Sequence, residues 1–305
     1  MTHLYSAYGL TLRTPFICEG LIEADPGAAD VEVVEGSVPR ELANPLVREK
    51  TFDVLPERFL FRGGRHSARF LVEQGTRVTF ARNVACQNDL FQHHFLRNVM
   101  VAILRQRQLL VLHASCAVNC AKTVVVAGEP GAGKSTTMAA LLTQGWRMVS
   151  DDVVALRLND QECLEALPGA IHVYLHDDAA AALTVDTAGL PRSEWHRQKM
   201  ALPLGESRSS TPGVVSKFIH LEKLTSHDLR TVHVTGHKKL PLLLRSLYGP
   251  ISVGEIATRF DLFAAALRAV KMFSVARPDD SWTLDRVVAL ATDDETDMSD
   301  GIDYG

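Results

Sequence analysis

The sequence lacks the features that would direct it to a membrane, a secretion pathway or nucleic acid. No apolar run approaches 18 residues, so we expect no membrane-spanning helix. Residues 1–8 contain no basic segment followed by an apolar core, so we expect no secretion signal. The net charge is −4 and no basic face is evident, which argues against a nucleic-acid partner.

Cysteine is scarce as well. The chain has 5 cysteines, an odd number, and no Cys-x-x-Cys pair. This usage is typical of reduced, mostly buried thiols, and it predicts a cytoplasmic protein. The length of 305 residues, with 46% hydrophobic and 22% charged residues, suits one large globular domain or two ordinary ones.

A glycine-rich loop is the most informative feature that is present. The β-branched run 123–126 predicts a buried strand, and residues 136–142 predict a helix. Between them lies Gly128-x-x-x-x-Gly133-Lys134-Ser135, the pattern of a phosphate-binding P-loop. Its glycines let backbone N–H groups turn toward phosphate oxygens, Lys134 can reach the β- and γ-phosphates, and Ser135 can ligate Mg²⁺. We expect a nucleoside triphosphate at Gly128, Glu129, Pro130, Gly131, Ala132, Gly133, Lys134, Ser135 and Thr136.

Two adjacent carboxylates follow the next predicted strand. Residues 146–149 form that strand, and Asp151 and Asp152 stand at its end. In a β-α-β unit both strands end at the same edge of the sheet, so the two aspartates should arrive beside the triphosphate. One carboxylate can hold Mg²⁺, and the other can accept a proton from an attacking hydroxyl. The residues alone do not assign the two roles.

The chain before the loop is predicted to contain short strands and one helix. Residues 1–88 should form a small β-rich lobe, with strands at 8–12, 30–34, 59–61, 68–72 and 77–80. A helix should begin at Asn88 or Asp89 and run to about residue 106. We expect His93 and His94 on this helix to be surface or capping residues.

The chain after the aspartates carries fewer chemical signals. His172 and His176 would share one face of a strand about 13 Å apart, which is too far for one metal ion. The polar segment 205–217 predicts a mobile, substrate-facing loop. Lys199 and Arg245 are candidate phosphate contacts.

The C-terminal third is predicted to complete a domain over residues 89–290. Strands are expected at 218–222, 231–234 and 272–276, and helices at 255–270 and 284–290. Residues 291–305 are acidic and almost free of apolar side chains, so we expect a disordered tail.

The motifs around the loop resemble the C-terminal kinase domain of HPr kinase/phosphorylase. The matching residues are His113-Ala-Ser, Gly128-Glu-Pro-Gly-Ala-Gly-Lys-Ser and Trp146-Arg-Met-Val-Ser-Asp151-Asp152. In particular, residues 109–158 look like the HPr-kinase-like serine kinases of bacterial peptide-modification clusters, including lasso-peptide precursor kinases. The Glu-Ile/Val-Arg-Gly-Leu/Ile-Gly segment of true HPr kinase/phosphorylases is absent downstream.

The resemblance implies an α/β P-loop kinase fold of the type shared with phosphoenolpyruvate carboxykinase. His113, which alone would be interpreted as a core residue, would lie near the transferred phosphate. The resemblance also suggests Asp151 as the catalytic base and Asp152 as a metal ligand. Because the downstream segment is missing, the resemblance does not extend to the phosphorylase reaction, to HPr as substrate or to hexamer assembly.

We therefore hypothesise an ATP- and Mg²⁺-dependent kinase that phosphorylates a serine hydroxyl of a peptide or small protein. Asp151, His113 and Lys134 would be catalytic, and Ser135 and Asp152 would hold the metal. Two alternatives stay open: a kinase for a small metabolite or amino acid, and a non-catalytic ATP-sensing module. The sequence predicts no oligomeric state.

Overall fold

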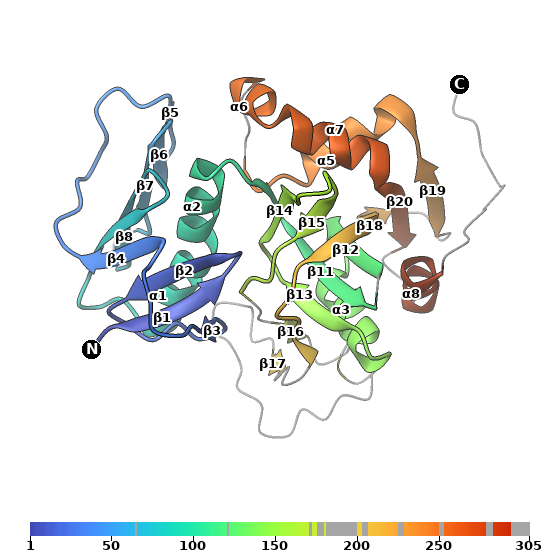
Figure 1. Cartoon of the computed structure of the whole chain (residues 1–305), viewed down its shortest axis with the longest axis horizontal. Helices are drawn as coiled ribbons and strands as arrows, with labels where there is room; N and C mark the ends of the chain where they lie inside the picture. Colours follow the sequence, from blue (N-terminus) through green and yellow to red (C-terminus); the bar gives the residue numbers. More distant parts are fainter. Residues whose placement is uncertain are drawn as a thin grey trace.

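The computed structural model has a mixed α/β fold with two large sheets (Figure 1). It describes residues 1–64, 66–120, 122–170, 173–175, 180, 200–202, 207–224, 229–249, 253–278 and 283–293. Over these residues the strands form two nine-stranded sheets and one short two-stranded pair. No helix among the described residues is both long enough and apolar enough to cross a bilayer.

The first sheet is built by the N-terminal residues, in the strand order β3-β1-β2-β4-β9-β8-β7-β6-β5. Its strands are β1 (His3–Ala7), β2 (Leu10–Thr14), β3 (Ile22–Glu23), β4 (Val31–Glu35), β5 (Val47–Arg48), β6 (Phe52–Leu55), β7 (Arg58–Arg62), β8 (Ala68–Glu73) and β9 (Arg77–Arg82). Four of the five predicted strands are confirmed. The strand predicted over 8–12 begins later, because Tyr8 and Gly9, both with positive φ, form the turn between β1 and β2.

One long helix lies between the two sheets. It consists of α1 (Asn88–His94), a π-helical turn η1 (Phe95–Val99) and α2 (Met100–Gln106), which confirms the predicted helix. Phe91 and Phe95 share one hydrophobic cluster with Phe70 of the first sheet and with Val153 and Ala155 near the second. The helix therefore packs against both sheets (Figure 1).

The second sheet has the order β10-β14-β15-β18-β12-β11-β13, with β20 beside β18 and β19 beside β20. Its strands are β10 (Leu110–Leu112), β11 (Ala114–Asn119), β12 (Lys122–Gly128), β13 (Arg147–Ser150), β14 (Val154–Leu158), β15 (Leu164–Ala166), β18 (Gly213–Leu224), β19 (Arg230–Val234) and β20 (Lys271–Pro278); the separate pair is β16 (Val173–Leu175) and β17 (Met200–Leu202). Strands β12, β18 and β20 are parallel, and β11 lies antiparallel between β12 and β13. The predicted β-α-β unit is therefore present, with β11 inserted between its two strands.

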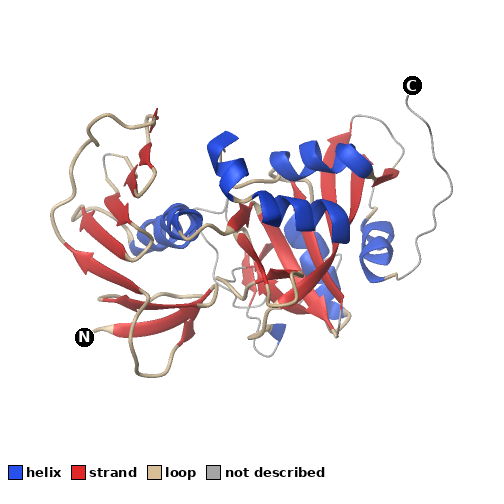
Figure 2. Ribbon diagram, turned by 45° about the horizontal axis from the view of Figure 1, so that its top comes forward, coloured by secondary structure: helices blue, strands red, loops and turns tan. Residues whose placement is uncertain are grey.

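Helices cover both faces of the second sheet (Figure 2). On one face α3 (Lys134–Thr143) and α8 (Leu284–Thr292) pack on Val124 and Val126. On the other, α5 (Lys239–Arg245) and α7 (Phe260–Ala269) pack on Val125 and Ala127; η3 (Gly236–Lys238) and α6 (Val253–Thr258) precede them. Burial on both faces explains why β12 is an unbroken apolar run rather than an alternating one.

Two sequence predictions are wrong in part. Residues 213–217 do not lie in a mobile loop, because they form the first part of β18, where Val215 and Lys217 are buried. The helix expected over 255–270 is broken at Arg259 into α6 and α7, and Phe260 at the start of α7 is 66% exposed. The predictions for His172, His176, Lys199 and residues 294–305 fall outside the described residues. The boundary at residue 88 stays a prediction.

Candidate active site

Three segments that carry predicted site residues meet at one edge of the second sheet. Gly128 at the end of β12 is level with Leu221 of β18, and Leu221 is level with Val275 of β20. On the other side of β12, Ala114 pairs with Ala127, so His113 comes directly before the strand that neighbours the loop. Ser150, which precedes Asp151, is level with Cys116 of that same strand. The tertiary fold thus gathers the loop, His113 and the two aspartates at this edge.

The backbone of the glycine loop (residues 128–135) requires its glycines. Gly128, Gly131 and Gly133 have φ values of 141°, 83° and 99°, where L side chains are strained. A Cβ at Gly128 would lie 2.2 Å from the Leu221 carbonyl oxygen, and one at Gly133 would lie 2.1 Å from Nη1 of Arg277. Gly133 is also the N-cap of α3. Because glycine has no side chain to accept their hydrogen bonds, the first N–H groups of this ten-residue helix are open toward the loop.

Lys134 is held inside the loop. Its Nζ donates hydrogen bonds to the carbonyl oxygens of Gly128 at 2.7 Å and Glu129 at 3.2 Å. The residue is only 9% exposed. Ser135 and Thr136 are half-buried in the first turn of α3, whereas Glu129, Pro130 and Gly131 are exposed. The ammonium group therefore lies at the centre of the loop, where a phosphate chain would be received.

Two further cations, which sequence reasoning missed, stand at the same edge. Lys223 and Arg277 are level with each other at the ends of β18 and β20. A Cβ built on Gly131 would lie 3.4 Å from Nζ of Lys223, and Arg277 Nη1 donates to the Ala132 carbonyl at 3.1 Å. Only the parallel register brings these side chains to the loop. The predicted phosphate contact Arg245 lies 3.5 Å from Glu222 Oε1, and its role stays a prediction.

Asp151 is a buried carboxylate with few stabilising partners. The residue is 8% exposed and accepts a hydrogen bond from Ser115 Oγ at 2.5 Å. Burial, followed by the negative charge of Asp152, raises the pKa of Asp151 to about 7, against the opposing effect of the Ser115 hydroxyl. A carboxyl group that titrates near neutrality is suited to accept a proton in catalysis.

Asp152 has a different environment from its neighbour. Its backbone is in the left-handed region with φ 65°, and its Oδ1 lies 2.5 Å from Nη2 of Arg97 and 3.6 Å from Nε2 of His113. The His113 ring stacks on Tyr248 at 5.2 Å, and the His113 N–H donates to the Ser246 carbonyl at 2.8 Å. His113 therefore stands beside the acidic pair and keeps 34% of its side chain exposed.

Arg97 enters the site from the helix between the sheets. It lies in η1, and π-helical turns often occur at functional sites. Burial is the largest single influence on its guanidinium and lowers the pKa, but the charges of Asp152, Tyr248 and Asp151 and the hydrogen bond to Asp152 together outweigh burial, so the pKa is raised and the group stays charged. No sequence signal marks this arginine, because its partner follows more than fifty positions later in the chain.

Two histidines near these elements are neutral at physiological pH. His94, predicted to be a surface or capping residue, is half-buried: its ring packs on Phe61 at 4.7 Å, and burial lowers its pKa to about 4. His220 of β18 is level with Ala127 and holds Ser246 Oγ at 2.9 Å from its Nδ1. Burial, followed by the charge of Arg245, lowers its pKa to about 4.

The residues at this edge fit a magnesium–nucleotide complex. The loop offers backbone N–H groups and Lys134 to phosphates, and the Ser135 hydroxyl and Asp152 carboxylate are oxygen ligands of the kind that Mg²⁺ prefers. Among the described residues no group of three or more His, Cys, Asp and Glu side chains could hold a metal ion. Mg²⁺ at nucleotide sites needs only one or two protein ligands, because phosphates and water complete its shell.

Comparison with known proteins adds a slight structural likeness. No protein-family model matches the chain, and no curated protein matches it in sequence. The chain is similar to the HPr(Ser) kinase/phosphatase from Coxiella burnetii, with 13% identity, a TM-score of 0.28, and coverage of 59% of this chain and 89% of that one. A likeness this slight carries no argument, so the interpretation depends on the residues of the site.

Proposed function

We propose that this protein is an ATP- and Mg²⁺-dependent kinase that phosphorylates a serine hydroxyl of a peptide or small protein. The observation that supports this most directly is Asp151, a buried carboxylate with a pKa raised to about 7 at the sheet edge that also carries the glycine loop. A protein that only sensed ATP would need no such proton acceptor. The peptide acceptor follows from the resemblance of the motifs to kinases of peptide-modification clusters.

Each residue has a distinct part in the proposed reaction. Backbone N–H groups of residues 128–135 and the Lys134 ammonium would bind the phosphates, with Ser135 and Asp152 on the metal. When bound, ATP would supply the phosphoryl group, and Mg²⁺ would neutralise the charge of the phosphates. Asp151 accepts the proton of the serine hydroxyl as the serine oxygen bonds to the γ-phosphorus and ADP leaves. Ser115 orients Asp151 through its hydrogen bond.

His113 and Arg97 would act around the acidic pair. Arg97 balances the charge of Asp152, which keeps two adjacent carboxylates tolerable in a largely buried place. His113, 3.6 Å from Asp152 and partly exposed, stands where it can donate to an oxygen of the transferred phosphate. Lys223 and Arg277 extend the positive charge of the loop toward the same phosphates.

The test is phosphate transfer from γ-labelled ATP to a library of serine-containing peptides, with the product located by mass. We expect Lys134→Ala and Asp151→Asn each to reduce transfer by about 10²-fold or more while both proteins stay folded. Lys50→Ala, which removes an exposed lysine from the turn between β5 and β6, should transfer like the unmodified protein. Full activity in either site variant would contradict the assignment. Turnover of free serine without peptide would favour the metabolite kinase, and tight ATP binding without any product would favour the sensing module.

A further inference from the structure

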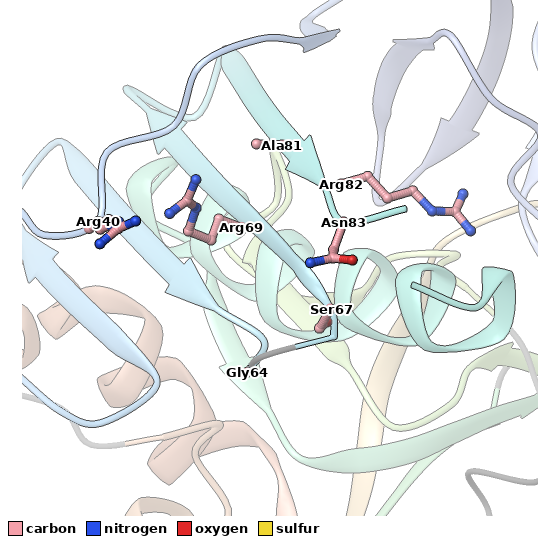
Figure 3. Close-up of a pocket in the computed structure, with 7 residues that line it drawn as sticks. All are labelled: Arg40, Gly64, Ser67, Arg69, Ala81, Arg82 and Asn83. Atoms are coloured by element: carbon pink, nitrogen blue, oxygen red, sulfur yellow. The ribbon is translucent and has the colours of Figure 1, made fainter. Parts of the chain in front are cut away.

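A cavity of about 850 Å³ opens on the first sheet, far from the glycine loop in the chain. It is lined by Arg40, Gly64, Ser67, Arg69, Ala81 and Asn83, with the stem of Arg82 at its side (Figure 3). Arg69 and Ala81 pair across β8 and β9, so they share one sheet face. Ala81 packs with Leu60 and Leu71, whereas Phe70 packs with the long helix, so the cavity lies on the outer face.

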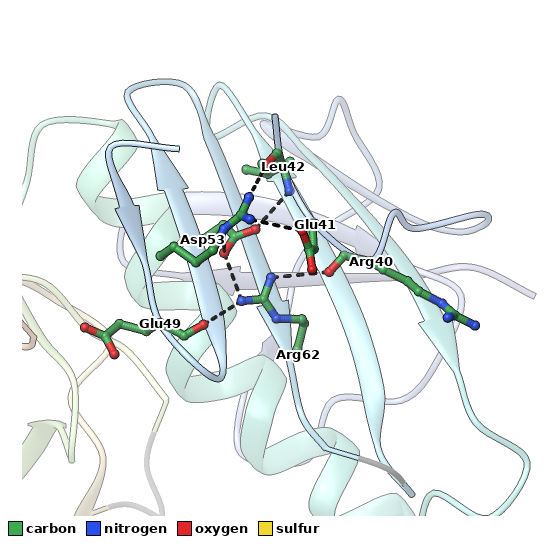
Figure 4. Close-up of polar contacts among 7 residues, drawn as sticks. Arg40, Glu41, Leu42, Glu49, Asp53 and Arg62 are labelled. Atoms are coloured by element: carbon green, nitrogen blue, oxygen red, sulfur yellow. Dashed lines mark hydrogen bonds and ion pairs between the residues drawn. The ribbon is translucent and has the colours of Figure 1, made fainter. Parts of the chain in front are cut away.

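Unbalanced positive charge is the first unusual property of this cavity. Arg69 of β8 is directly opposite Arg62 of β7, and like charges opposite each other destabilise a sheet. The Arg62 guanidinium is neutralised by Asp53 at 2.9 Å (Figure 4). Within the described part of the chain, no acidic side chain pairs with the guanidinium groups of Arg40 or Arg69. The charge of Arg62 is thus balanced within the sheet, whereas the described residues do not balance the charges of Arg40 and Arg69.

The third arginine at the cavity has other partners. Nη2 of Arg82 donates to the Cys86 carbonyl at 2.8 Å, and its guanidinium lies over the Phe91 ring at 4.8 Å. Figure 3 shows this side chain turned away from the cavity. The charge available to a ligand therefore comes from Arg40 and Arg69.

A buried hydroxyl without a partner is the second unusual property. Ser67 is 6% exposed and lines the cavity, yet its Oγ makes no hydrogen bond. Leaving a buried hydroxyl unpaired is unfavourable, and a ligand that accepts its hydrogen bond removes this cost. Figure 3 shows Ser67 and Gly64 toward one end of the cavity and Arg40 toward the other, so the donors are spread along it.

Two free guanidinium groups and one free hydroxyl define an anionic ligand with several acceptor oxygens. Guanidinium forks match carboxylates in geometry, and the volume far exceeds that of a single ion. The first sheet, on which the cavity opens, also contacts the helix that carries Arg97 of the candidate active site. Phe61 of β7 packs on His94, which lies three positions before Arg97. We propose, on the basis of the kinase function above, that this cavity binds the carboxylates of an acidic stretch in the acceptor polypeptide.

The experiment measures fluorescence anisotropy of a fluorescein-labelled hexaglutamate peptide at low ionic strength. The double variant Arg40→Ala/Arg69→Ala should weaken binding by about tenfold or more. Arg77→Ala is the matched control, because Arg77 is an exposed arginine of β9 outside the cavity, and its affinity should stay within about twofold. Absence of binding by the unmodified protein, or equal binding by all three, would overturn the proposal.

Two further variants, Ser67→Ala and Lys134→Ala, test the hydroxyl of the cavity and the independence of the cavity from phosphate transfer. Ser67→Ala should weaken hexaglutamate binding without lowering the thermal midpoint, because it removes a hydroxyl that has no partner in the free protein. Lys134→Ala should bind hexaglutamate like the unmodified protein, so this measurement stands even if no phosphate transfer is found. Binding of inorganic phosphate without binding of hexaglutamate would assign a free-anion site and refute the polypeptide ligand.

Discussion

Two buried carboxylates, one on each sheet, show how the same side chain is used in opposite ways. Asp53 of β6 is fully buried and accepts hydrogen bonds from Nη2 of Arg62 at 2.9 Å and from the Leu42 N–H at 2.9 Å (Figure 4). Nε of Arg48 lies 3.5 Å from the same carboxylate. These partners, Arg62 first, lower its pKa. Asp151 has Ser115 as its hydroxyl partner and a second carboxylate beside it, and its pKa is raised to about 7.

The difference lies in where the cation is placed. In the first sheet both arginines converge on the single carboxylate, so its negative charge stabilises the fold. At the second sheet Arg97 binds Asp152 instead, at 2.5 Å. Asp151 is therefore left buried, close to another negative charge and ready to take up a proton. Burial is the largest influence on the pKa of Asp151, whereas the hydrogen bond from Arg62 is the largest influence on that of Asp53, so the partner set decides whether burial raises the pKa of a carboxylate.

The largest expected effect is on stability. Asp53→Asn should reduce the free energy of unfolding by about 2–3 kcal/mol, because two arginines lose their charge partner in a place that is only partly open to water. Asp151→Asn should leave that free energy equal or higher, since it removes an unfavourable buried charge. Urea unfolding at pH 8 measures both. If the two variants lose similar stability, the contrast between the sites is wrong.

The pH dependence of stability should separate the same two residues by sign. A lowered pKa makes Asp53 stabilise the protein above its unfolded value near 4, and this stabilisation is lost as the pH falls through the folded pKa. A raised pKa makes Asp151 do the reverse, so its protonated form favours folding and stability falls as the pH rises from about 4 to about 7. In unfolding series from pH 4 to 8, the free energy of unfolding of Asp151→Asn should therefore increase relative to that of the unmodified protein as the pH approaches 8. A constant difference would contradict the raised pKa.

A smaller effect is expected on the pH profile of phosphate transfer. The rate should rise with pH around an apparent pKa near 7 as Asp151 loses its proton. Arg97→Met should move this midpoint up, because the Arg97 charge lowers the pKa of Asp151, whereas Asp152→Asn should move it down. Arg105→Met is the control on the same helix, since Arg105 pairs with Glu255 at 2.5 Å away from the aspartates. A midpoint that moves equally in all three variants would show a general structural effect.

The smallest expected effect concerns the contact between the two sheets. The buried Tyr8 hydroxyl donates to the Val153 carbonyl at 3.1 Å and accepts from the Ala170 N–H at 3.3 Å. Tyr8→Phe should lower the free energy of unfolding by about 1 kcal/mol, with little change in phosphate transfer. Thermal unfolding and the transfer assay together check this. A large loss of transfer would mean that the β1–β2 turn also positions Asp151 and Asp152.

Much of the fold could be predicted because its signals are local. The strands of the first sheet after residue 30, the long helix, β12 and the helix after the loop each follow from residue periodicity and turn residues. The break at Arg259 and the first part of β18 were not predicted, because they depend on tertiary contacts rather than on local signals. The segment 205–217 is polar overall, yet pairing with β12 and β15 makes its residues 213–217 a strand.

The sequence by itself determined the glycine loop, whose φ angles only glycine adopts without strain, and the acidic pair that one crossover helix returns to the same edge. Only the tertiary structure decided which side chains surround that edge, because Arg97, Tyr248, Lys223 and Arg277 come from distant segments and a single residue of these types has no local signature. It also decided which carboxylate has a lowered pKa and which has a raised one. Charge interactions act through space, and their strength depends on distances and burial that exist only after the sheets and the helix between them have packed.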